Sequence, residues 1–151
     1  MGYLSTVEYK GDLRTEAIHL DSSEQIHTDA PKDHEGKGEA FSPTDLVATS
    51  LASCMITVMG IKAKQHGIKM VGTTADVVKE MSADPRRISA IRINIHFLNN
   101  YSDKERILLE RTANTCPVRN SLSDELAVAV SYTHLRAHET DSYLVCRLLL
   151  E

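Results

Sequence analysis

The chain has 151 residues, of which 42% are hydrophobic and 25% are charged, and its formal net charge is −4 at pH 7. This length and composition suit one domain with a substantial hydrophobic core. The nearly balanced charge, the lack of a basic stripe and the absence of tryptophan argue against nucleic acid as a partner.

The first residues contain no long apolar stretch, so the sequence predicts no signal peptide. The apolar run over residues 46–61 is interrupted by serines and threonines, and we expect it to fall short of a membrane span. Three cysteines without a leader indicate a reducing cytoplasm, where paired thiols are more often catalytic or redox-sensing than structural.

The chain begins with three predicted strands. Residues 5–10 and 12–20 form a hairpin around a Gly-Asp turn, and residues 24–29 supply the third strand. Residues 29–43 are polar and contain proline and glycine, which is typical of a loop.

A long helix is predicted from Ser42 to about His66. Ser42 can cap it, Pro43 suits the first helical position, and Asp45 completes a capping box. Because residues 46–61 carry no charge, we expect every side of this helix to be buried, with a second subunit covering part of it.

The second half of the chain predicts two long strands, over residues 68–82 and 86–99, joined by a turn. In the second strand, one face consists of Ser89, Ile91, Ile93, Ile95 and Phe97. A helix over residues 102–115, a helical turn at Cys116-Pro117 and a strand from Leu126 follow. The order β-β-β-α-β-β-α-α-β predicts an α+β fold.

The end of the chain resembles a translated sequencing adapter. Residues 130–140 and 143–150 match two fixed segments of a transposase-type adapter in one reading frame, and a short index separates them. We therefore expect a C-terminally truncated domain over residues 1–129 and a non-native tail over residues 130–151.

This tail imitates a metal site. Its potential ligands are His134, His138, Glu139 and Cys146, which could suggest zinc. Because the residues match adapter sequence, we predict no metal and no other cofactor.

Three motifs, SPTDLVATSLASCM, the DPRRI turn and CPVRNSL, occur in order along the chain. Together they resemble the OsmC/Ohr family of thiol peroxidases, and its general OsmC-like branch in particular. The resemblance covers roughly residues 4–126. It implies an intertwined homodimer in which the helices that carry Cys54 lie at the interface.

The resemblance also implies the reacting groups. Cys54 matches the peroxidatic cysteine of the family, and Cys116 matches the cysteine that resolves it as a disulfide. Burial in an apolar helix raises the pKa of a thiol, so a cation must stabilise the thiolate. The family uses an arginine from the first strands, and Arg14 is the only arginine there.

The carboxylate that pairs with this arginine is less clearly placed. In the characterised reductases it follows the proline that opens the helix, but Thr44 occupies that position here. Asp45 and Glu39 are the alternatives, and Asp45 can also serve simply as a helix cap.

We expect reduction of organic hydroperoxides to alcohols, with an external dithiol as the reductant. Leu51, Met55 and Val58 lie near Cys54 in the sequence and favour an apolar substrate. The alternative is a non-catalytic dimeric protein that senses redox state or binds a small molecule on the same scaffold.

Overall fold

The computed structural model describes residues 2–134. Its elements follow the predicted α+β order, with one added turn of 3-10 helix, η1 (Lys32–His34). The chain divides into two compact units; the first ends at Val47 and the second begins at Ala48.

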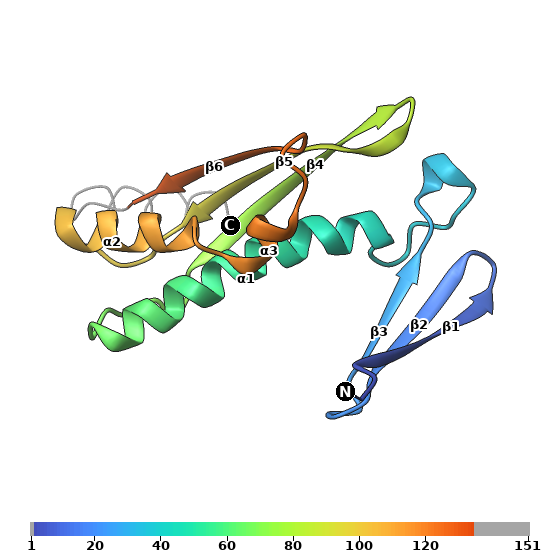
Figure 1. Cartoon of the computed structure of the whole chain (residues 1–151), viewed down its shortest axis with the longest axis horizontal. Coiled ribbons are helices and arrows are strands. Elements are labelled where there is room, and N and C mark those ends of the chain that lie inside the picture. Colours follow the sequence, from blue (N-terminus) through green and yellow to red (C-terminus); the bar gives the residue numbers. More distant parts are fainter. Residues whose placement is uncertain (1, 135–151) are drawn as a thin grey trace, which may run out of the picture. The chain divides into compact units, whose positions relative to one another are not determined.

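The first unit contains an antiparallel sheet of three strands in the order β1-β2-β3 (Figure 1). The hairpin between β1 and β2 has the predicted Gly11-Asp12 turn, in which both residues have positive φ, +88° and +53°. Glycine adopts this conformation without the steric cost that a Cβ atom would bring, which explains its place in the turn. The strands are β1 (Ser5–Gly11), β2 (Arg14–His19) and β3 (Gln25–Asp29).

The second unit contains a sheet in the order β4-β5-β6 and most of the long helix α1 (Figure 1). β4 and β5 form the predicted antiparallel hairpin. β6 pairs with β5 in parallel, so the chain must cross over through α2 and α3 before it enters β6. The elements are α1 (Pro43–Gln65), β4 (Thr74–Ala83), β5 (Arg86–His96), α2 (Asp103–Ala113), α3 (Pro117–Ser121) and β6 (Ala127–Thr133).

The core of the second unit lies between one face of β5 and the helices α1 and α2. The predicted apolar face of β5 is confirmed, since its isoleucines and the following phenylalanine are at most 1% exposed. Leu51, Met55 and Met59 of α1 lie in the same buried cluster and follow the spacing of one helix face. Leu109 of α2 completes the contact.

The fourth strand begins later than the sequence predicted. It starts at Thr74 rather than at Ile68, and the intervening residues form a turn closed by a hydrogen bond from Thr73 N–H to the Met70 carbonyl at 2.9 Å. Gly72 lies in this segment with φ +93°. The apolar residues before Gly72 made the predicted strand too long, because in the structure they belong to a turn that precedes β4.

The last strand passes the boundary at which the sequence placed the end of the domain. β6 continues through Val130 to Thr133 and pairs with β5 along its whole length. The domain boundary predicted after residue 129 therefore lies within a strand. A backbone ladder accepts any sequence that can remain extended, so this pairing leaves the adapter origin of the tail as a prediction.

The length of α1 also corrects an expectation. At 23 residues, with a mean hydropathy of 1.6 in its most apolar window, it is long and apolar enough to cross a membrane. The sequence argument that it falls short was wrong. The core helix of a soluble protein passes the same test, and α1 carries fully buried residues of the core.

Substitution of a buried and of an exposed aliphatic residue of α2 tests which face of the helix lies in the core. Leu109→Ala removes a fully buried side chain and is expected to lower the free energy of unfolding by about 2–5 kcal/mol. Ile107→Ala, on the same helix but 51% exposed, is the matched control and is expected to change it by less than about 1 kcal/mol. Urea unfolding followed by circular dichroism measures both. Equal losses at the two positions would contradict the described core.

Candidate active site

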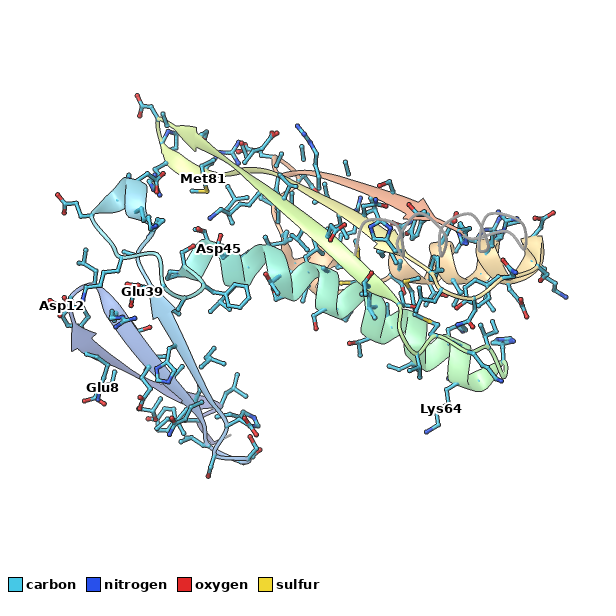
Figure 2. The ribbon with its side chains drawn as sticks, turned by 180° about the vertical axis from the view of Figure 1, so that it is seen from behind. Glu8, Asp12, Glu39, Asp45, Lys64 and Met81 are labelled. Atoms are coloured by element: carbon cyan, nitrogen blue, oxygen red, sulfur yellow. The ribbon has the colours of Figure 1, made fainter. Side chains whose placement is uncertain are left out.

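The start of α1 follows the capping pattern predicted from the sequence. Asp45 N–H donates to Ser42 Oγ at 3.1 Å, and Ser42 N–H donates to Asp45 Oδ2 at 3.0 Å. Thr44 Oγ1 lies 3.2 Å from Ser42 Oγ. The helix-cap interpretation of Asp45 is therefore confirmed, and a role in a reaction stays a prediction. Asp45 is labelled at the start of α1 in Figure 2.

Cys54 lies on α1 at the margin of the buried face. It is half-buried and packs against the core cluster, next to the fully buried Met55. Each residue of a helix is rotated by about 100° from the previous one, so Cys54 stands beside the core face without sharing its full burial. Leu51 is also fully buried, so of the three predicted apolar neighbours only Val58 is partly exposed.

Cys116 enters the same cluster from the junction of α2 and α3. It is fully buried and caps α3, with its Sγ accepting a hydrogen bond from Arg119 N–H at 3.5 Å. Pro117 occupies the first turn of α3, as the sequence predicted. The helical turn therefore fixes the position of the thiol through the backbone.

The two thiols interact and both are free. Burial raises the pKa of Cys116 above its ordinary value, and the hydrogen bond with Cys54 raises it further. The backbone N–H of Arg119 acts in the opposite direction with a smaller effect. Cys116 is therefore a protonated thiol at neutral pH.

Arg14 belongs to the first unit, where it begins strand β2. Its Nη2 atom donates to Glu39 Oε2 at 3.0 Å and lies 3.8 Å from Asp29 Oδ2. Of the two carboxylates proposed from the sequence, Glu39 is thus a direct partner of Arg14. Glu39 lies in the segment between β3 and α1, where Figure 2 labels it.

Asp29 was not among the residues predicted from the sequence. This residue is fully buried and stands opposite Arg14 in the register of β2 and β3. Its Oδ2 atom accepts the backbone N–H of Glu39 at 2.9 Å. The signal that could have found it is the alternation of the two strands, because pairing them through a short connection brings Arg14 and Asp29 face to face.

The residues that imitate a zinc site lie mostly outside the described part of the chain. This holds for His138, Glu139 and Cys146. His134 is described, and its Nε2 atom lies 2.7 Å from Glu110 Oε1. Residues 2–134 contain no group of three or more histidine, cysteine or acidic side chains that could hold a metal.

The chain is similar to a known protein family. The family model described as OsmC-like protein matches residues 36–131. The chain belongs to the OsmC-like family. The predicted resemblance is therefore confirmed, and it covers both cysteine segments.

Solved structures share the fold. A candidate osmotic stress induced and detoxification response protein from Psychrobacter arcticus 273-4 is 53% identical, with a TM-score of 0.86 over 88% of this chain and 97% of that one. The organic hydroperoxide resistance protein OsmC from Legionella pneumophila is 18% identical, with a TM-score of 0.68 over 87% and 97%. OhrB of Bacillus subtilis is 15% identical, with a TM-score of 0.62 over 87% and 98%. No curated protein gives a significant match.

This OsmC-like chain thus carries a half-buried thiol that interacts with a fully buried one. Two neighbouring thiols can give up two electrons to an oxidant and form an S–S bond. The first unit, described by itself, contains a guanidinium paired with two carboxylates. Thiol redox chemistry is the chemistry that the two cysteines of the second unit support.

The pKa of Cys116 predicts how the two thiols react with iodoacetamide. Since only thiolates react and burial raises the pKa of Cys116, we expect its labelling to be slow at pH 7 and to become faster as the pH rises. Cys54, which is half-buried, should be labelled first at pH 7. Mass spectrometry of separate tryptic peptides measures both cysteines and keeps Cys146 apart. Preferential labelling of Cys116 at pH 7 would contradict the described burial.

Proposed function

We propose that the protein is a thiol peroxidase that reduces organic hydroperoxides to alcohols through Cys54 and Cys116. One observation carries this proposal: a half-buried thiol, packed against the apolar core cluster, interacts with a fully buried thiol of that cluster. The family supports a peroxide-related redox role, and structural neighbours include proteins named for hydroperoxide resistance.

In the first step the Cys54 thiolate attacks the terminal oxygen of the hydroperoxide. The S–O bond forms, the O–O bond breaks, and the alkoxide leaves and takes up a proton to become the alcohol. Cys54 is then a sulfenic acid, oxidised by two electrons. The alcohol carries the electrons that the sulfur lost.

In the second step Cys116 resolves the sulfenic acid. Its thiolate attacks the Cys54 sulfur, the S–S bond forms, and the S–O bond breaks with release of hydroxide, which is protonated to water. Because burial raises the pKa of Cys116, this thiol must lose its proton as it attacks. An external dithiol then reduces the disulfide and returns the two electrons, a reaction suited to a reducing cytoplasm.

Arg14 is the proposed stabiliser of the Cys54 thiolate. A guanidinium has five donors, so its bonds to carboxylates leave other N–H groups for a sulfur anion or for the peroxide. The charge also offsets the loss of solvation at the half-buried sulfur. Asp45 remains a proposed contributor through the start of α1, where its carboxylate caps the helix.

The substrate is proposed to be apolar. Cys54 lies within a cluster of aliphatic and methionine side chains, and Val58 is partly exposed one turn further along α1. An alkyl or lipid hydroperoxide gains burial of its chain at such a surface, whereas hydrogen peroxide does not.

A homodimer is the proposed assembly. α1 presents an uncharged stripe made of Ser50, Ser53, Thr57 and Ile61 on the side away from the core, and these four residues are exposed within the described chain. The side chain of Ile61 is 55% exposed.

The first unit also exposes apolar side chains on its strands. A second copy of the chain would remove this surface from water. The most exposed strand residues of this kind are Val7, Tyr9 and Ile26.

Replacement of single cysteines tests the reaction. We expect Cys54→Ser to reduce turnover of cumene hydroperoxide with dithiothreitol to the uncatalysed level, because the nucleophile is gone. Cys116→Ser should still consume one peroxide per chain but form no disulfide with Cys54. Stopped-flow oxidation and disulfide mapping by mass spectrometry measure these outcomes.

Cys146→Ser is the matched control and should behave as the unmodified protein. A slow reaction that Cys54→Ser leaves unchanged would contradict the enzyme proposal. It would favour the alternative of a non-catalytic redox-sensing or ligand-binding protein.

A charge placed on the exposed stripe tests the dimer. Ile61→Glu is expected to shift sedimentation from dimer toward monomer at micromolar concentration, since burial of an unpaired carboxylate is unfavourable. Val71→Glu is the control, because Val71 is 96% exposed but lies in the loop after α1. Identical sedimentation of the unmodified protein and Ile61→Glu would contradict the proposed interface.

A further inference from the structure

The loop between α1 and β4, residues 66–73, carries an apolar side chain that the proposed reaction does not use. Val71 is 96% exposed, the highest value of any large apolar side chain among the described residues. Leu98, from the loop after β5, is 51% exposed and lies against Gly72, where a Cβ atom would stand 2.6 Å from Leu98 Cδ1. Val71 and Leu98 therefore form one exposed apolar tip.

The loop that carries the tip is fixed by hydrogen bonds within the second unit. The Lys69 carbonyl accepts Asn99 Nδ2 at 3.1 Å and the Tyr101 hydroxyl at 2.5 Å. Thr73 N–H donates to the Met70 carbonyl and closes the turn. A single exposed apolar side chain is ordinary on a protein surface. Here both loops are tied to one another, so the tip cannot withdraw from whatever lies outside the protein.

The charge around the tip is positive. Residues 46–75 contain three lysines and no acidic residue, although the whole chain has a net charge of −4. Lys64 and Lys69 are exposed and line an open groove of about 530 Å³ beside Val71. The other described residues along this groove are uncharged. Figure 2 shows the side chain of Lys64 projecting from the end of α1.

The acidic side chains that follow the two loops have partners of their own. Asp76 Oδ2 lies 2.9 Å from His96 Nε2, and Glu105 Oε2 accepts Ser102 N–H at 2.9 Å in the cap of α2. Neither of the two groove lysines pairs with a carboxylate of the described residues. Their ammonium groups are therefore available to an external anion.

An anionic lipid bilayer fits this surface better than other occupants do. Each lysine close to such a bilayer strengthens binding about fivefold, and an exposed apolar side chain gains by entering the boundary between headgroups and acyl chains. A free anion would use the lysines but not the tip. A symmetric contact between two copies would bring the same lysines together, and their like charges would repel.

We propose that the tip, with Lys64 and Lys69, docks the protein on the surface of an anionic phospholipid bilayer. Val71 and Leu98 enter the headgroup region, while α1 keeps its buried residues in the core of the second unit. The inference goes beyond the proposed function, because it needs neither thiol. It agrees with that function, since lipid hydroperoxides are among the proposed substrates and are held in such bilayers.

Co-sedimentation of the full chain with vesicles made of equal parts phosphatidylglycerol and phosphatidylcholine tests the charge. We expect binding that added salt weakens, and no binding to vesicles of phosphatidylcholine alone. Lys64→Gln/Lys69→Gln should weaken binding at least about tenfold. Lys32→Gln/Lys37→Gln is the matched control, because it removes the same charge at exposed positions of the first unit and should leave binding unchanged.

Val71→Trp tests insertion of the tip. The chain contains no tryptophan, so the fluorescence of this variant comes from one indole. We expect its emission to move to shorter wavelength when anionic vesicles are added, because the indole leaves water. Val78→Trp is the matched control, since Val78 is 51% exposed but lies on β4, and its emission should not move. Val71→Ser should weaken vesicle binding at least about fivefold, and Val78→Ser should not.

Absence of binding to anionic vesicles, or equal binding to vesicles of phosphatidylcholine alone, would overturn the proposal. So would unchanged emission of vesicle-bound Val71→Trp, because charge alone would then hold the protein. A shift of Val71→Ser toward monomer in sedimentation without vesicles would assign the tip to a contact between copies and would also overturn it. Circular dichroism establishes that each variant is folded. Vesicle binding requires no peroxide, so a protein without peroxidase activity leaves these outcomes unaffected.

Discussion

The burial of one face of α1 against β5 is the contact on which the rest of the second unit depends. Leu51, Met55 and Met59 are fully buried there, and each side chain of this kind contributes about 1.5–3 kcal/mol on transfer from water. The contact fixes the rotation of the helix about its axis. Cys54, adjacent to Met55, is thereby held at the margin of the core, where it interacts with Cys116 and stays partly exposed.

The two thiols differ in burial, and this difference affects their protonation. Burial favours the neutral form of a cysteine, and it raises the pKa of Cys116. A buried, protonated Cys116 does not compete for the peroxide, because only a thiolate is nucleophilic. The proposed order of events, with Cys54 oxidised first and Cys116 reacting second, therefore follows from the difference in burial and needs no difference in intrinsic chemistry.

The sequence predicted the elements well where local signals are strong. Alternation identified the buried face of β5, and Ser42 with Asp45 identified the start of α1. Prediction was weaker where the outcome depends on distant segments. The parallel pairing of β6 with β5 and the late start of β4 come from pairing and turn geometry that no single segment contains. Asp29 was missed for the same reason, because its importance comes from the register of two strands and from its burial.

Arg14 is paired with carboxylates although Thr44 stands at the position where the resemblance predicted one. At the helix start, Ser42, Thr44 and Asp45 bond to one another, and Ser42 Oγ satisfies the N–H group of Asp45 in the first turn of α1. A carboxylate that both capped the helix and oriented an arginine would have to divide its oxygens between these tasks. Here the β2–β3 ladder brings a separate, fully buried carboxylate to the arginine. Capping of α1 and ion pairing with Arg14 are thus carried by different residues, so either set of contacts can be altered while the other stays in place.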